Sequence, residues 1–234
     1  MRTGGAFLLK RIMELLFALA VLAGLLFAGD KVRTYVSVQQ ENVRRNLVVL
    51  DPGHGGKDPG KVGADEELEK DINLAISLKV REKLEEDGME VVMTREEDVM
   101  LSDGDADNKK LEDLNSRIGI INEQQPAIAV SIHQNSYSDP AVRGAQVFYF
   151  THSDKGKQAA EALQKELLEF DQENTRDIKA NDTYYLLKKT EVPTVIVECG
   201  FLSCPGEAEL LTDEAYQEEL AGAIAKGIES WVVK

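Results

Sequence analysis

The chain is short of cysteine, of histidine and of positive charge. Its 234 residues include only Cys199 and Cys204, three histidines, and 27 basic against 42 acidic side chains, for a net charge of −15. An exported disulfide scaffold would carry more cysteines, and this spacing does not match a zinc knuckle. We therefore expect two small buried side chains, with a disulfide between them as the alternative. The negative charge disfavours nucleic acid, whose phosphates nothing would neutralise, and docking on anionic lipid through a basic patch.

The composition otherwise fits one globular domain with a terminal segment, since 43% of the chain is hydrophobic and 29% is charged. Lys10 and Arg11 precede an apolar run over 15–28, a pattern typical of an export signal. No good cleavage pair follows, which favours an uncleaved signal-anchor over a cleaved signal peptide. The charge before the run predicts that the remainder lies outside the cytoplasm. We expect three segments: a signal peptide or signal-anchor over 1–29, a linker over 30–45 and one folded domain over 46–234.

Strand-like and helical patterns alternate along the folded domain. Apolar runs typical of strands occur at 47–50, 90–94, 127–132, 145–150 and 194–197. Apolar residues at helical spacing occur over 68–84, 111–121, 159–168 and 216–228. Strands that alternate with helices predict an α/β fold, as a single three-layer α/β/α domain with a mostly parallel, twisted sheet.

The acidic segment over 103–108 imitates the start of a calcium loop. Asp103, Asp105 and Asp107 fit the first three alternating ligands. Asn108 stands where glycine is needed, and Leu114 stands where the bidentate glutamate would be. We therefore expect an acidic, solvated loop rather than a calcium site.

Three of the predicted strands end in a titratable side chain. His54 follows Leu47-Val-Val-Leu-Asp-Pro-Gly, His133 follows Ile128-Ala-Val-Ser-Ile, and Glu198 follows Val195-Ile-Val. The carboxyl ends of parallel strands share one edge of a sheet, where open α/β folds keep their ligand sites. A carboxylate directly after an apolar run is costly unless it is paired or liganded. We therefore expect two imidazoles and a carboxylate to meet at this edge.

Glu69 adds a fourth group, because it opens the first predicted helix 15 residues after His54. Two imidazoles and one carboxylate are a familiar zinc set for hydrolysis, and a separate carboxylate would then move the proton. Spacing leaves open which of Glu69 and Glu198 binds the metal, and Glu69 is also explained as an ordinary acid at a helix N-terminus. His152 competes as a third ligand, but its polar turn favours a surface or capping role.

Five stretches make the pattern specific, and they occur in order within residues 46 to 230. They are Val48-Val-Leu-Asp-Pro-Gly-His-Gly-Gly-Lys-Asp-Pro-Gly60, Glu69-Lys-Asp-Ile-Asn-Leu-Ala75, Val92-Met-Thr-Arg95, Ser131-Ile-His-Gln-Asn135 and Val197-Glu-Cys-Gly-Phe-Leu-Ser203. In these stretches the chain resembles the zinc-dependent N-acetylmuramoyl-L-alanine amidases. The resemblance implies a Zn²⁺ cofactor with His54, Glu69 and His133 as its ligands and Glu198 as the catalytic residue. It also implies hydrolysis of the amide between N-acetylmuramic acid and L-alanine in peptidoglycan.

The sequence departs from the family pattern at three positions. Cys199 stands where an apolar residue is usual, Cys204 where asparagine is common, and Gln134 in place of a small residue beside His133. None of these changes removes a predicted ligand, so they bear on the local shape of the pocket.

Size and layout resemble the germination-specific spore-cortex amidases of endospore-forming bacteria. That resemblance implies removal of stem peptides for muramic δ-lactam formation, on the outer face of the membrane or in the spore intermembrane space. The apolar N-terminal run predicts that this segment can anchor the protein to the membrane, and we expect an accessory membrane or lipoprotein partner for stability.

Other functions are weighed beside this one. A general autolysin for cell separation shares the chemistry, a zinc carboxypeptidase would release terminal D-alanine instead, and a non-catalytic peptidoglycan-binding protein would keep only the fold. The intact set of His54, Glu69, His133 and Glu198 weighs against the last of these.

Overall fold

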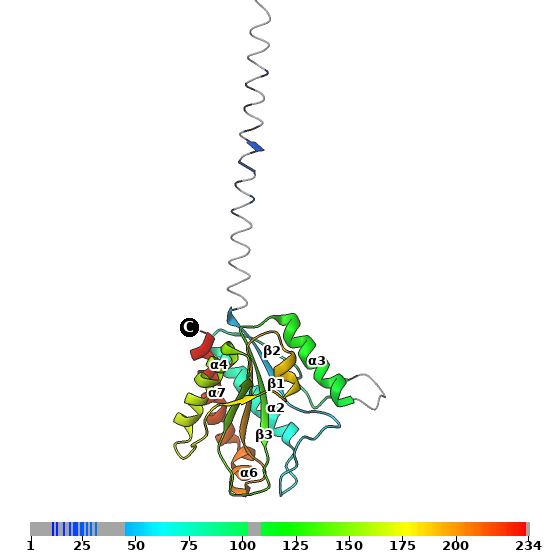
Figure 1. Cartoon of the computed structure of the whole chain (residues 1–234), viewed down its shortest axis with the longest axis vertical. Helices are drawn as coiled ribbons and strands as arrows, with labels where there is room; N and C mark the ends of the chain where they lie inside the picture. Colours follow the sequence, from blue (N-terminus) through cyan, green and yellow to red (C-terminus); the bar gives the residue numbers. More distant parts are fainter. Residues whose placement is uncertain are drawn as a thin grey trace, which may run out of the picture. The chain divides into compact units, whose positions relative to one another are not determined.

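The computed structural model describes scattered residues between Arg11 and Lys31, then residues 45–102 and 109–232 (Figure 1). The chain divides into two units, Met1–Val43 and Arg44–Lys234. In the first unit the described residues are helical and exposed. Among all described residues, no helix is both long and apolar enough to cross a bilayer. Most of the predicted segments 1–29 and 30–45, and all of the acidic loop 103–108, lie outside the described residues.

The second unit is built on a six-stranded sheet in the order β2-β1-β3-β6-β4-β5. The strands are β1 Leu47–Pro52, β2 Glu90–Met93, β3 Ile128–Asn135, β4 Gln146–Phe150, β5 Lys179–Asn181 and β6 Thr194–Phe201. Strands β2, β1, β3 and β6 run parallel, whereas β4 pairs antiparallel with β6 and parallel with β5. The prediction of a mostly parallel sheet is confirmed.

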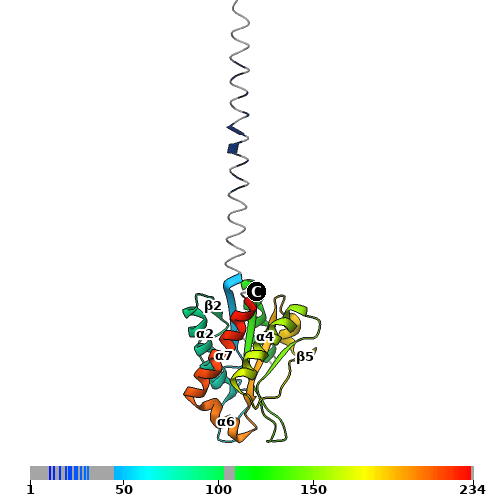
Figure 2. The same cartoon turned by 90° about the vertical axis from the view of Figure 1, so that its left-hand side faces the viewer.

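Helices cover both faces of this sheet. They are α2 Glu69–Glu86, α3 Lys109–Gln124, α4 Asp154–Phe170, α5 Tyr185–Lys189, α6 Pro205–Thr212 and α7 Glu214–Val232. One face packs against α2, α4 and α7, with α7 in contact with both of the other two (Figure 2). The opposite face carries α3 and α5. The predicted three-layer α/β/α arrangement is therefore confirmed. One helical layer contains α2, α4 and α7, and the other contains α3 and α5.

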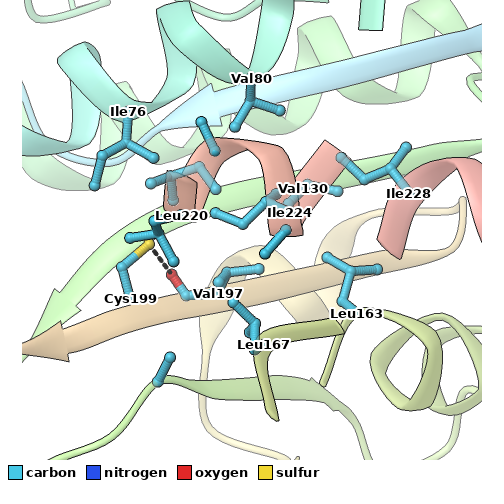
Figure 3. Packing of buried hydrophobic residues seen from close by; sticks show 14 of the residues in the cluster. Ile76, Val80, Val130, Leu163, Leu167, Val197, Cys199, Leu220, Ile224 and Ile228 are labelled. Carbon is cyan, nitrogen blue, oxygen red and sulfur yellow. Dashed lines mark hydrogen bonds between the residues drawn. The ribbon is translucent and has the colours of Figure 1, made fainter. Parts of the chain in front are cut away.

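Strand alternation explains why the two faces differ. Successive strand side chains point to opposite faces, so Val48 and Leu50 join the larger core and Val49 joins the smaller one. In the larger core, α7 lays Leu220, Ile224 and Ile228 over the strands (Figure 3). The smaller core contains residues from α3 and α5. Most of the apolar residues that the sequence places at helical spacing fill these cores, whereas Leu111 at the start of the second stripe is exposed.

Three short elements lie where the sequence predicts none. They are β5, α5 and α6, with three, five and eight residues. Elements of this length have too few residues to display a period. The strands β3 and β6 also extend beyond their predicted ends, to Asn135 and Phe201.

Both cysteines are free thiols, so the alternative of a disulfide between them is not adopted. Cys199 is 1% exposed, and its thiol lies 3.9 Å from the carbonyl oxygen of Val197 within the core (Figure 3). Cys204 is half-buried and is the N-cap residue of α6. The expectation of two buried cysteines therefore holds fully for Cys199 and partly for Cys204.

Close packing of α7 on α4 depends on one glycine. A Cβ added at Gly227 would lie 2.7 Å from the Cα of Leu163, whereas a Cβ at Gly222 would come no nearer than 3.8 Å to the mobile end of Lys83. We predict that Gly227→Ala lowers the free energy of unfolding by about 1–3 kcal/mol through overpacking. Gly222→Ala, in the same helix, should stabilise by roughly 0.5–1 kcal/mol or less. Urea denaturation of both variants checks this, and equal effects would contradict it.

Candidate metal centre and catalytic pocket

The carboxyl ends of β1, β3 and β6 lie side by side at one edge of the sheet. β3 is the neighbour of both β1 and β6, and His133 is in register with Glu198. Beyond β1, the Gly53 amide donates a hydrogen bond to the Ile132 carbonyl at 3.0 Å, which draws the following turn toward β3. The topology thus brings His54, His133 and Glu198 to the same edge, as the strand pattern predicts.

Glu69, the first residue of α2, lies between the two imidazoles. Its Oε1 is 3.2 Å from His54 Nε2 and 2.9 Å from His133 Nδ1. One ligand atom from each of these three residues lies within 4.8 Å of the others. The two imidazole rings are 5.0 Å apart and nearly perpendicular. Two nitrogens and one carboxylate oxygen therefore point to a common space that suits a divalent cation.

Glu69 is held as a carboxylate. Burial by itself would raise the pKa of Glu69, but hydrogen bonds and charge from His133 and His54 outweigh it and bring that pKa well below its usual range. Main-chain amides add to this, because Lys61 donates to Oε2 at 2.7 Å and Gln134 donates to Oε1 at 3.1 Å. The anionic form is the form that ligates a metal.

A glycine-rich turn allows the close approach of these groups. His54 has a φ of 61°, a conformation uncommon for a residue with a side chain. A Cβ at Gly53 would lie 2.2 Å from Cε1 of His133, and a Cβ at Gly60 would lie 2.5 Å from Oε2 of Glu69. Side chains at these two positions would therefore push the candidate ligands apart.

Asp58 fixes the orientation of the His54 ring. Its Oδ2 is 2.8 Å from His54 Nδ1, and its Oδ1 accepts from Lys110 Nζ at 2.8 Å. Because Nδ1 is occupied by Asp58, Nε2 faces Glu69 and His133. Burial lowers the pKa of His54, but Glu69 and Asp58 together outweigh it and raise that pKa. A carboxylate behind a ligating histidine is a common support in metal sites.

Two buried arginines hold the backbone of the turn. Arg117 of α3 donates to Asp51 Oδ1 at 2.7 Å and to the His54 carbonyl at 2.6 Å. Arg95, which follows β2, donates to the carbonyls of Pro52 and Gly53 at 2.9 and 3.0 Å. These contacts stabilise a turn whose backbone conformation is unfavourable by itself.

Glu198 stands beside the ligand group but outside it. It is 7% exposed, and its Oε2 has no hydrogen-bond partner in the described part of the chain. Burial raises the pKa of Glu198, although the nearby charge of His133 acts to lower it. His54, Glu69, His133 and Glu198 all line one cavity of about 490 Å³. A buried carboxyl with a raised pKa in such a cavity is suited to exchange a proton.

The chain matches one protein family along most of its length. The profile described as N-acetylmuramoyl-L-alanine amidase matches residues 48–230. The chain belongs to this family. Its members hydrolyse the amide between N-acetylmuramic acid and L-alanine in peptidoglycan, and this is the activity of the chain.

Individual relatives agree with the family match. The germination-specific N-acetylmuramoyl-L-alanine amidase of Bacillus subtilis is 38% identical over 185 residues, which are 78% of each chain. The CwlD amidase from Clostridioides difficile, solved in complex with the GerS lipoprotein, is 42% identical with a TM-score of 0.78, over 80% of this chain and 98% of that one. AmiC2 of Nostoc punctiforme is 32% identical with a TM-score of 0.72, over 81% and 98%.

The remaining predicted site residues fall outside the group. His152 is exposed and packs edge-on against the Phe150 ring at 5.4 Å, so this amidase does not bring it to the candidate ligands. Gln134 is buried, and its side-chain amide donates to Asn73 Oδ1 at 3.1 Å. The sequence reasoning did not find Asp58, Arg95 and Arg117, although the first two lie in stretches that carry the family resemblance.

The amidase should lose stability in acid partly through Asp51. Burial raises the pKa of Asp51, but Arg117, with hydrogen bonds from Ser131 and Thr94, outweighs it and lowers that pKa to about 2 from 3.8. A depressed carboxyl pKa contributes stability that is complete above the unfolded pKa and is lost as the pH falls through the folded one. The contribution is roughly 2 kcal/mol. It should be complete above about pH 5 and disappear toward pH 2.

The matched variant is Asp51→Asn, which lacks the titrating group. Urea unfolding of the wild type and of this variant should differ most above about pH 5, and the difference should shrink as the pH approaches 2. A difference that stays constant over this range would show that Asp51 does not titrate as described.

Proposed function

We propose that this amidase is a zinc enzyme in which His54, Glu69 and His133 hold the ion and Glu198 moves the proton. The observation that carries the proposal is the convergence of the three ligand atoms within 4.8 Å, with a separate buried carboxyl beside them. Two imidazole nitrogens and one carboxylate oxygen are a donor set that zinc accepts in hydrolases, with a position left for water. The support of His54 by Asp58 fits the same role.

The surroundings of the two glutamates support this proposed assignment of roles. A bound zinc ion supplies Lewis acidity toward the scissile carbonyl and the attacking water. Glu69 faces both imidazoles and stays anionic, which suits a ligand. Glu198 has a raised pKa and an unpaired oxygen, so it can accept a proton from water and return it to the departing nitrogen.

Substitution of Glu198 tests the proton role. Glu198→Gln keeps the shape of the side chain but cannot take up a proton, so peptide release from purified sacculi should fall about a hundredfold to ten-thousandfold. Zinc content, measured by elemental analysis, should match that of the wild type. His54→Ala should lose both zinc and activity, as should the wild type treated with a chelator. Full activity of Glu198→Gln, or unchanged zinc in His54→Ala, would contradict the assignment.

Gly53 tests the geometry without removal of a ligand. A methyl group at this position would overlap the His133 ring, so Gly53→Ala should weaken zinc binding roughly tenfold to a hundredfold. Gly119→Ala is the control, because a Cβ there meets nothing within 4 Å. Competition titration with a zinc chelator measures both variants. Equal zinc affinity in Gly53→Ala and the wild type would argue against His133 as a ligand.

We further propose that the enzyme acts outside the cytoplasm on spore cortex, anchored by residues 1–29 and assisted by a lipoprotein. Support comes from the likeness to the germination-specific relative of Bacillus subtilis and to an amidase solved with a lipoprotein. Deletion of the gene should remove muramic δ-lactam from cortex and leave daughter-cell separation normal. Defective separation with normal cortex would favour the general autolysin instead.

A further inference from the structure

A second hollow adjoins the catalytic cavity. Its volume is about 430 Å³, and Asn135 and Tyr184 line both hollows. Residues of β4 and β5, the Arg176 side chain and the end of β6 at Phe201 form the rest of its wall. A substrate bound at the candidate metal centre can therefore extend into this hollow without leaving the protein surface. We call it the β5 groove.

The β5 groove has an unusual charge for this chain. Its lining includes Arg176 and Lys179 and no aspartate or glutamate, although the whole chain carries a net charge of −15. In the described part of the chain neither cation forms an ion pair with a carboxylate. The groove is therefore a local positive site on an acidic protein, which attracts an anion.

Both cations are held in place by aromatic rings. The Arg176 guanidinium lies 5.0 Å from the centre of the Phe201 ring, and its Nε donates to the Arg143 carbonyl at 2.9 Å. The Lys179 ammonium lies 5.6 Å from the centre of the Phe148 ring. Contact with a ring face restrains a cation while its remaining N–H groups stay free to donate. This is a prepared binding surface rather than a pair of freely moving side chains.

Two amide side chains add further donors. The Oδ1 of Asn135 accepts from the Ser136 amide at 2.8 Å, and the Oδ1 of Asn181 accepts from the Tyr184 amide at 2.7 Å. Each acceptor oxygen is thus used within the protein, which leaves the NH₂ group of each side chain to donate. Cations and donors without a competing carboxylate match the chemistry of a carboxylate ligand.

We propose that the β5 groove binds a free carboxylate on the peptide part of the substrate, and so makes the enzyme selective for acidic peptides. The proposal rests on the proposed function, since it needs the scissile amide at the candidate metal centre. The peptide part is favoured because its backbone or side-chain carboxylates are free, whereas the lactyl carboxyl of muramic acid is consumed in the scissile amide. The rest of the glycan offers hydroxyl and acetamido groups, which need no cations.

A pair of substrates tests this selectivity. One is a muramyl peptide with a free carboxylate next to the L-alanine, and the other is the same compound with a carboxamide. The wild type should prefer the free carboxylate roughly tenfold, through KM rather than kcat. Lys179→Gln and the double variant with Arg176→Gln should reduce this preference in steps, mainly by a higher KM for the acidic substrate. Lys188→Gln, an exposed lysine outside the groove, should behave as the wild type.

Each alternative result has a definite meaning. Equal turnover of the two substrates by the wild type overturns the proposal, as does an equal loss on both substrates in Lys179→Gln. A loss that depends on glycan length and not on the carboxylate would assign the groove to the glycan strand, which also overturns it. Lys179 is exposed, so its substitution keeps the test valid if the double variant fails to fold.

A binding measurement separates this proposal from the proposed function. Calorimetry with Glu198→Gln and the two substrates measures carboxylate-dependent binding without turnover. Binding that favours the free carboxylate roughly tenfold and weakens in Lys179→Gln supports the groove, even if the wild type proved inactive. Hydrolysis of both substrates without such a preference would leave the amidase assignment intact and remove the groove from it.

Discussion

The site depends on one buried guanidinium. Arg117 of α3 is 2% exposed and is paired with Asp113 of the same helix at 2.6 Å. It joins α3 to β1 through Asp51 at 2.7 Å and to the glycine-rich turn through the His54 carbonyl at 2.6 Å. A planar fork with several fixed donors can hold three elements at once, whereas a lysine would offer a single charged point. The positive charge of Arg117 balances the Asp51 carboxylate, and Thr94 and Ser131 donate further hydrogen bonds to its two oxygens. The burial of this charge is therefore tolerated. The backbone of His54 is therefore set by the fold around it rather than by its own preference.

That fixed backbone explains how four polar groups share a small space. Gly53 and Gly60 remove the side chains that would otherwise separate His133, Glu69 and His54. The carboxylate of Glu69 then receives main-chain donors from Lys61 and Gln134, which lowers the cost of keeping a charge inside the protein. For Glu198, burial raises the pKa although the nearby charge of His133 and a hydrogen bond from Tyr184 oppose the rise, and Oε2 has no hydrogen-bond partner in the described part of the chain. The neighbours of Glu69 lower its pKa, and the burial of Glu198 raises its pKa. Such a difference between two carboxyl groups of the same type is common in active sites.

Much of this could be predicted from the sequence, because long elements and strand ends leave clear patterns. The apolar runs and helical stripes locate the major strands and helices, and the titratable residues after β1, β3 and β6 locate the edge of the sheet that carries the site. Spacing could not separate the proposed roles of Glu69 and Glu198, because the burial and hydrogen bonds that distinguish the two side chains arise only in three dimensions. It also missed Arg117, which looks like an ordinary polar residue of an amphipathic helix but donates hydrogen bonds to Asp51 at the end of β1 and to the turn at His54. The short β5, which lines the groove through Lys179 and Asn181, has too few residues to show a period in the sequence.

The two faces of the sheet carry different features, because the larger core lies on one face and the catalytic cavity is lined by the helices of the other. The larger core lies under α2, α4 and α7, and the hollow between those helices carries seven carboxyl groups against two lysines. The other face carries the two helices α3 and α5, and residues of both helices line the catalytic cavity. The catalytic cavity combines Lys61, Lys110 and Arg117 with five carboxyl groups, whereas the charged residues that line the adjoining β5 groove are Arg176 and Lys179. A carboxylate group is therefore repelled by the hollow between α2, α4 and α7 and attracted by the β5 groove. Because the chain as a whole is acidic, these two cations make the β5 groove a local place where an anionic part of the substrate is attracted.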